Sequence, residues 1–221
     1  MRRHIATEKC TSVPRRGTSR RLALRAALLA TVVLAGCSRE EAGAPKPSGS
    51  FKSIDITGAD YAQALELPDP DGKRRTLAEF KGKVVVLFFG FTQCPDVCPT
   101  TMAELATAKQ QLGADKSRVV PVFVTVDPER DTPDVLKAYV GSFGPDFVAL
   151  RGTPEETKAV AKAFKIFYAK VPGKTESSYT IDHTARSYVY DTRGRLRLAT
   201  RHGMGMDALV SDLRRLLAEK G

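Results

Sequence analysis

Hydrophobic and polar residues come in blocks along residues 51–221, and the length and spacing of each block predict the element that it forms. Two nearly continuous apolar runs, at 83–89 and 119–126, are typical of strands that are covered on both faces. Longer stretches place apolar residues every three or four positions, which is the spacing of one helix face. The helices predicted in this way span 100–112, 133–140, 154–164 and 206–217.

Turn signals predict two hairpins. The turn Asp69-Pro70-Asp71-Gly72 separates 64–67 from 75–77, and a second polar turn separates 184–190 from 195–199. The other predicted elements are a helical turn at 77–80, a short strand at 147–150, an extended segment at 165–168 and a loop at 172–179. Strands that alternate with helices and end in a hairpin and a helix predict an α/β, thioredoxin-like fold. Its central mixed sheet is flanked by helices, with an N-terminal hairpin extension.

The first 37 residues have the character of an export signal and not of a folded domain. Arginines crowd the first part, and an uncharged run then extends from Ala26 over only 12 residues to Cys37. A bilayer span needs about 20 residues, so this run is typical of the hydrophobic region of a secretory signal. The residues around Ser19-Arg20-Arg21 loosely resemble a twin-arginine signal, and both export routes place the body outside the cytoplasm.

The segment Leu34-Ala35-Gly36-Cys37 resembles a bacterial lipoprotein box. This predicts that Cys37 is lipidated, becomes the mature N-terminus and anchors a lipoprotein that faces the periplasm from the bacterial cell envelope. The alternative is a short N-terminal membrane anchor with an unmodified Cys37. We therefore expect a signal peptide at 1–37, a flexible polar linker at 38–50 and one domain at 51–221.

The net charge of +10 does not indicate nucleic-acid binding, because it is concentrated in the signal. Residues 1–37 hold eight Lys or Arg and one Glu, a net charge of +7, which leaves +3 for residues 38–221. A basic stripe on the domain would be needed to attract a polyanion. We therefore expect no nucleic-acid partner.

Two cysteines, Cys94 and Cys98, follow the first apolar run at the point where a strand passes into a helix. We expect Pro99 at the first helical position, and we expect the helix N-terminus to lower the pKa of the thiols. Three residues separate the cysteines, where a redox pair of the Cys-x-x-Cys type has two. The pair can therefore form a disulfide or hold a soft metal ion such as Cu(I), and a structural or inert pair is the third possibility.

His183 is the candidate third ligand, since it lies just ahead of the closing hairpin, whose entry loop should lie against the cysteines. The alternative is a histidine held by ordinary hydrogen bonds. Asp182 could orient the His183 ring, but we expect it to point away, and Asp96 could face solvent or touch a partner. We expect Asp127, Glu129, Arg130 and Asp131 to pair with one another near the site, because carboxylates suit copper poorly. His202, Met204 and Met206 form a weaker candidate for a second copper site, in which Met206 is expected to belong to the core.

Three motifs together resemble the Sco/SenC/PrrC family. They are Phe91-Thr92-x-Cys94-Pro95-Asp96-Val97-Cys98-Pro99-Thr100, Val126-Asp127-Pro128-Glu129-Arg130-Asp131-Thr132 and Ile181-Asp182-His183-Thr184. Members of that family are thioredoxin-like, membrane-tethered copper proteins that serve cytochrome c oxidase assembly. The resemblance, over about residues 51–221, implies that Cys94, Cys98 and His183 bind copper as Cu(I) or Cu(II).

The resemblance also implies a metallochaperone, not an enzyme, that delivers copper to the Cu(A) site of oxidase subunit II or maintains its thiols. A copper donor protein is a further implied partner. The alternative function is a thiol-disulfide oxidoreductase that uses Cys94 and Cys98, which would be a disulfide in the oxidised form. A structural zinc site is a third possibility, but it would want four protein ligands.

Overall fold

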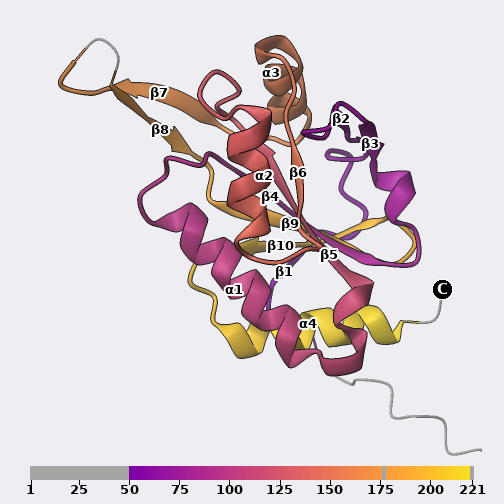
Figure 1. Ribbon diagram of the computed structural model, residues 1–221. Helices are drawn as coiled ribbons and strands as arrows, with labels where there is room; N and C mark the ends of the chain where they lie inside the picture. Colours follow the sequence, from indigo (N-terminus) through magenta and orange to yellow (C-terminus); the bar gives the residue numbers. More distant parts are fainter. Residues whose placement is uncertain (1–49, 176–177, 220–221) are drawn as a thin grey trace, which may run out of the picture. The chain divides into compact units, whose positions relative to one another are not determined.

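The computed structural model describes residues 50–175 and 178–219, and its centre is a six-stranded mixed sheet (Figure 1). The strand order is β1-β10-β9-β4-β5-β6, in which β4, β5 and β6 are parallel and the other pairings are antiparallel. The strands are β1 (Ile54–Asp55), β2 (Glu66–Pro68), β3 (Arg74–Thr76), β4 (Val84–Gly90), β5 (Val119–Thr125), β6 (Val148–Leu150), β7 (Tyr168–Pro172), β8 (Tyr179–His183), β9 (Arg186–Tyr190) and β10 (Leu196–Arg201). The helices are α1 (Val97–Gln111), α2 (Pro133–Gly141), α3 (Pro154–Ala163) and α4 (Met206–Ala218), with short 3-10 helices η1 (Leu77–Phe80) and η2 (Gly113–Arg118).

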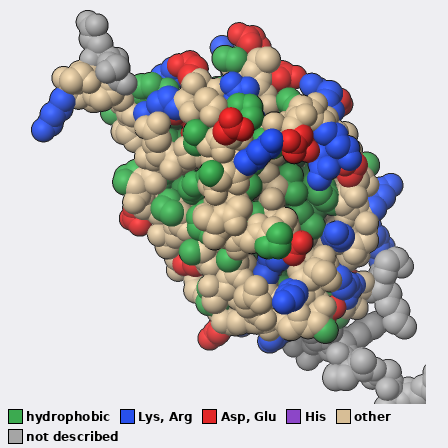
Figure 2. Space-filling view, viewed as in Figure 1, with side chains coloured by type: hydrophobic (Ala, Val, Ile, Leu, Met, Phe, Trp, Pro, Cys, Tyr) green, Lys and Arg blue, Asp and Glu red, His purple; other side chains and the backbone are tan. Residues whose placement is uncertain are grey.

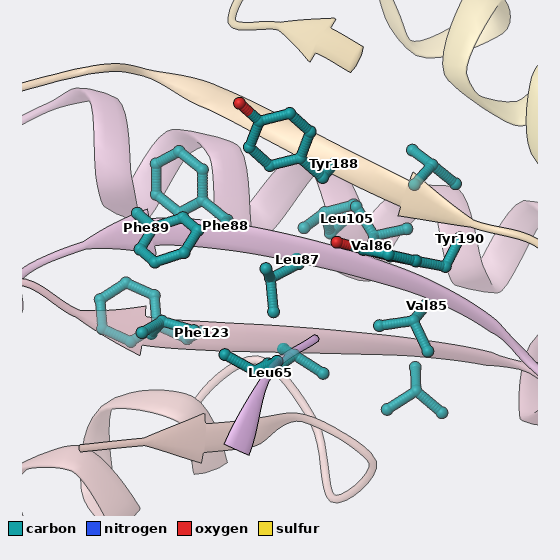
Figure 3. Packing of buried hydrophobic residues seen from close by; sticks show 14 of the residues in the cluster. Leu65, Val85, Val86, Leu87, Phe88, Phe89, Leu105, Phe123, Tyr188 and Tyr190 are labelled. Carbon is teal, nitrogen blue, oxygen red and sulfur yellow. The ribbon is translucent and has the colours of Figure 1, made fainter. Parts of the chain in front are cut away.

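The two apolar runs form β4 and β5, and every residue of both strands is buried. Successive side chains of a strand point to opposite faces of the sheet. Phe88 therefore packs on one face near Leu105 of α1, while Phe89 packs on the other face against Phe164, with ring centroids 5.2 Å apart (Figure 3). Helices on both faces explain why these strands are apolar throughout and do not alternate with polar residues.

Helices α1 and α4 lie side by side on one face of the sheet (Figure 1). Helix α2 packs on the same face, where Tyr139 contacts Phe123, and the end of α3 packs on the opposite face, where Phe164 contacts Phe89. Two of the helices begin at strong sequence signals. The Thr132 hydroxyl accepts a hydrogen bond from the backbone N–H of Val135, and Thr153 forms a capping box with Glu156. In the same view, hydrophobic side chains gather near the middle of the face, and charged side chains of both signs surround them (Figure 2).

Both predicted hairpins are present, and so is the helical turn at Leu77–Phe80. The fold class is as predicted: an α/β domain with a central mixed sheet flanked by helices and a separate N-terminal hairpin, β2–β3. One further strand, β1, was not expected. Its two residues pair with Ala199 and Leu198 of β10, too short a segment to leave a periodic signal.

The prediction that the helix after the cysteines begins with Pro99 is wrong. Helix α1 begins at Val97, so Cys98 is its second residue and Pro99 its third. The first backbone N–H groups of a helix have no intrahelical partner, so a proline is tolerated in any of these positions. The N–H of Cys98 is left free for another acceptor.

The predicted loop at 172–179 connects two strands whose pairing was not expected. Strands β7 and β8 form a separate antiparallel pair, in which Tyr168 lies opposite His183. The strands were missed because most of their residues are exposed or half-buried, so the apolar alternation of a buried strand is absent. His183 therefore ends a strand and does not lie in a loop.

No helix among the described residues is both long enough and apolar enough to cross a bilayer. Cys37, the signal at 1–37 and nearly all of the linker at 38–50 lie outside the described residues. Those predictions stay predictions.

Candidate metal centre

Three segments bring Cys94, Cys98 and His183 together. Strand β4 ends at Gly90, the loop that follows it carries Cys94, and α1 supplies Cys98 from its first turn. His183 comes from the end of β8, 85 positions after Cys98. Their two sulfurs and the imidazole nitrogen all lie within 4.8 Å of one another. Among the described residues, this is the one such group of three or more potential Cys, His, Asp or Glu ligands.

Two polar contacts link Cys94, Cys98 and His183, and both are long. The backbone N–H of Cys98 donates to Cys94 Sγ at 3.4 Å, and Cys98 Sγ lies 3.5 Å from His183 Nε2. The cysteines are both free thiols here. Each sulfur and the imidazole Nε2 therefore retain a lone pair for a shared ligand.

His183 is oriented by its other ring nitrogen. Nδ1 lies 3.3 Å from the carbonyl oxygen of Thr184, which can only accept a hydrogen bond. In that contact Nδ1 carries the proton, and Nε2 is left unprotonated toward the sulfurs. Burial lowers the pKa of His183, although the Thr184 carbonyl acts in the opposite direction. Burial therefore favours the neutral imidazole, and the Thr184 contact leaves its other nitrogen, Nε2, aimed at the cysteines.

Aromatic rings shield the imidazole from water. The rings of Phe88 and Phe91 meet His183 edge to face, with centroids 6.1 Å and 5.8 Å away, and both phenylalanines are almost completely buried. Apolar walls of this kind strengthen any interaction made inside them, because water no longer competes.

The two cysteines differ in environment. Cys94 is half-buried, whereas Cys98 is completely buried. Burial raises the pKa of the Cys98 thiol far above its usual range, and the neighbouring Cys94 raises it further. The expectation that the helix N-terminus lowers the thiol pKa is therefore wrong for Cys98, since desolvation of the thiolate outweighs the helix dipole.

The sequence predicted that residues of the polar loop after β5 pair with one another. In the structure they also pair with residues outside the loop. Asp127 is buried and pairs with Arg130, but it also accepts a hydrogen bond from the Tyr179 hydroxyl at 2.8 Å. The guanidinium of Arg130 donates to the Tyr179 carbonyl and lies 3.6 Å from the centre of the Tyr179 ring. Glu129 pairs with Lys170 on β7. The contacts of Asp127 and Arg130 therefore fasten the β7–β8 hairpin, and with it His183, to the sheet.

Asp131 has a structural role that the sequence did not reveal. Its carboxylate accepts hydrogen bonds from the hydroxyls of Thr92 and Thr125 and from the backbone N–H of Thr92. This buried group connects the cysteine loop to the end of β5. The sequence signal that could have indicated this role is position along the chain: Asp131 follows a buried strand, and Thr92 stands just before the cysteines.

The remaining candidates lie apart from the three ligands. Asp182 and Asp96 are exposed, Asp182 as expected, and Asp96 accepts a hydrogen bond from Thr100. His202 is exposed and contacts the Thr101 hydroxyl, while the Met204 sulfur accepts from Ser53. Met206 is partly buried against the core, as expected. The donor set of the centre is thus two sulfurs and one imidazole, which suits a soft ion such as Cu(I).

Comparison with known proteins gives consistent results. The family model described as SCO1/SenC matches residues 55–218. A SCO2-like protein of Rickettsia prowazekii is 40% identical over 132 residues, which is 59% of this chain and 64% of that protein. The match thus spans less than two thirds of the relative.

Solved structures are similar over most of the domain. The structure of Bradyrhizobium japonicum ScoI with copper bound has a TM-score of 0.63 and 39% identity, and the match covers 70% of this chain and 98% of that one. A SCO1/SenC family lipoprotein from Bacillus anthracis has a TM-score of 0.57 and 25% identity, covering 71% of this chain and 97% of that one.

Proposed function

Because this chain belongs to the SCO1/SenC family, we propose that it is a copper metallochaperone that holds copper through Cys94, Cys98 and His183. Its proposed task is to deliver copper to the Cu(A) site of cytochrome c oxidase, or to maintain the thiols of that site. The proposed partners are oxidase subunit II and a copper donor protein.

The observation that carries the proposal is the convergence of two thiols and one imidazole within 4.8 Å. Sulfur and imidazole ligands select Cu(I), and three ligands leave room for an incoming ligand. A structural zinc site, by contrast, needs four ligands, and the described residues bring only three together. The similar structure of Bradyrhizobium japonicum ScoI, which has copper bound, supports copper as the metal.

The asymmetry of the cysteines fits a protein that must both hold and release its cargo. Cys98 is enclosed and fixed between α1 and the sheet, whereas Cys94 lies in a loop and is partly accessible. A partner can therefore approach from the Cys94 side. Both thiols must lose their protons when copper binds, so binding releases protons and weakens at lower pH.

We propose that Cys37 is lipidated and that residues 38–50 tether the domain at 51–221 to a bacterial membrane facing the periplasm. The similar lipoprotein from Bacillus anthracis supports an anchor of this type. Mass spectrometry of the mature N-terminus tests the proposal. We expect an acylated Cys37, and residues upstream of Cys37 or an unmodified thiol would overturn it.

The copper site is tested by loading the domain at 51–221 anaerobically with Cu(I) after reduction. We expect one tightly held copper in the parent and a loss in Cys94→Ala, Cys98→Ala and His183→Ala. His202→Ala is the matched control, because His202 is the other histidine of the described residues and lies outside the centre. Tight binding that survives His183→Ala would overturn the three-ligand site.

A thiol-disulfide oxidoreductase is the second candidate, and the closeness of the two free sulfurs favours it. In that reaction both thiols lose a proton and together two electrons to a partner disulfide, which becomes two thiols as the Cys94–Cys98 bond forms. His183 is not needed for this exchange. A parent that retains no copper but cycles readily with a disulfide substrate, unchanged by His183→Ala, would favour this function.

A further inference from the structure

Gly90, the last residue of β4, lies directly behind the sulfur of Cys98. A Cβ atom added to Gly90 would lie 2.7 Å from Cys98 Sγ, 2.9 Å from Phe88 Cε1 and 3.0 Å from Phe123 Cε2. Non-bonded heavy atoms in a packed interior prefer a separation of about 3.5 to 4.0 Å. The sulfur thus occupies the space that any side chain at position 90 would fill.

The backbone gives no reason for a glycine at this position. Gly90 does not have the positive φ found at Gly113 or Gly194. It pairs with Thr125 in the regular register of β4 and β5, and its carbonyl accepts from Val126 N–H at 2.8 Å. The absence of a side chain, and not backbone freedom, is therefore what the fold uses here.

We propose that Gly90 is a positioning residue for the metal centre. By lacking a side chain, it lets the Cys98 sulfur lie deep against the sheet, close to both Cys94 and His183. The inference rests on the proposed copper function and deepens it, since it adds a residue that has no donor atom to those that determine the site.

The sulfur is the neighbour that would move if a methyl group were added. Phe88 and Phe123 are buried and packed on each other, with Phe88 also against His183 and Phe123 against Tyr139. The Cys98 sulfur turns about one single bond into another staggered position. That turn carries the sulfur out of ligand distance of a shared ion, since metal–ligand distances tolerate changes of only about 0.2 Å.

The first test compares Gly90→Ala with the parent by competition for Cu(I) against a chromogenic chelator. We expect affinity to fall about 10- to 100-fold, the range typical of residues that orient a ligand. Gly141→Ala is the matched control, because a Cβ at Gly141 meets nothing within 4 Å. Affinity of Gly90→Ala within about twofold of the parent would overturn the proposal.

The second test needs no metal. It distinguishes the contact of the new methyl group with the Cys98 sulfur from its contacts with the two phenylalanine rings. The loss of stability caused by Gly90→Ala is measured by urea unfolding in the parent and in the Cys98→Ala background. If the new methyl group meets the sulfur, the loss should be clearly smaller when the sulfur is absent. An equal loss in both backgrounds would show that the rings alone resist the methyl group, and would overturn the proposal.

The two tests fail separately. If the parent holds no copper tightly, the proposed function is wrong, but the unfolding comparison still decides the contact between position 90 and Cys98. If Gly90→Ala does not fold alone, the Cys98→Ala background should restore folding. Failure to fold there as well would count against the sulfur contact.

Discussion

The two ends of the central sheet bury polar groups in opposite ways. At the β9–β10 turn, Asp191 accepts hydrogen bonds from backbone N–H groups of Arg193 and Arg195 and from the side chains of Arg195 and Arg197. Arg197 in turn pairs with Glu219 near the end of the chain's last helix. At the other end, where β4 terminates, the polar contacts of the Cys94, Cys98 and His183 side chains are long, at 3.3 to 3.5 Å.

The difference shows how one fold separates stability from chemistry. At the turn end, the buried charges of Asp191 and Arg197 pair with each other and with Arg195 and Glu219. The cysteine end leaves sulfur and nitrogen lone pairs facing one another without a strong partner. The threonines around Asp131 and the loop at Asp127 hold that arrangement in place from outside. Four predictions test this separation.

The largest change in stability is expected at the turn end. Asp191→Ala leaves Arg197 buried with one partner fewer, and breaking a buried ion pair typically costs about 3–5 kcal/mol. Urea unfolding of the apo protein measures the cost. Copper stoichiometry should stay at the parent value under conditions where the variant is folded. A variant that loses copper while folded would break the separation between the two ends.

Copper should stabilise the protein from the cysteine end. A ligand that binds only the folded state adds about 4 kcal/mol when its free concentration is about 1,000 times Kd. We expect Cu(I) to raise the unfolding midpoint of the parent and of Asp191→Ala, and a chelator to reverse the change. His183→Ala should show no such gain. A gain of equal size in His183→Ala would mean that copper stabilises the fold elsewhere.

The buried aspartates of the two ends should respond to pH with opposite sign. Burial raises the pKa of Asp131 above 3.8, despite hydrogen bonds from Thr125 and Thr92 that lower it. Burial also acts to raise the pKa of Asp191, but hydrogen bonds from Arg195 and Arg197 outweigh it and lower the pKa below 3.8.

The sign follows from which state binds the proton more tightly. The contribution of Asp131 is complete below pH 3.8 and is lost as pH rises through its folded-state pKa. The contribution of Asp191 is complete above pH 3.8 and is lost as pH falls through its folded-state pKa. In unfolding free energies measured across acidic pH, Asp131→Asn should flatten the profile above pH 3.8 and Asp191→Asn below it. Changes on the same side for both variants would contradict this.

The smallest effect is expected for an exposed pair beside the site. Glu129 and Lys170 lie 2.6 Å apart, but their side chains are 56% and 47% exposed. Exposed ion pairs contribute about 0–1 kcal/mol to the free energy of unfolding. Glu129→Gln should therefore lower it by less than about 1 kcal/mol and leave copper binding unchanged. A larger loss, measured by urea unfolding at several salt concentrations, would give this pair a real part in holding the β7–β8 hairpin.

The sequence by itself determined the elements whose signals are local. The apolar runs of β4 and β5, the polar turns of both predicted hairpins and the caps of α2 and α3 each lie within a few consecutive residues. The spacing of Cys94 and Cys98 is local in the same sense. These features could be predicted because neighbours along the chain supply most of the physical information that sets them.

The tertiary structure decided what depends on distant residues. His183 reaches Cys98 across 85 positions, and it does so on a hairpin whose exposed strands carry no periodic signal. The pKa of the Cys98 thiol is raised because the folded chain buries it completely, which no local pattern expresses. The need for glycine at position 90 likewise arises only when α1 packs against β4. Burial and close approach depend on residues from every part of the fold. The sequence alone could therefore name the candidate ligands but not their environment.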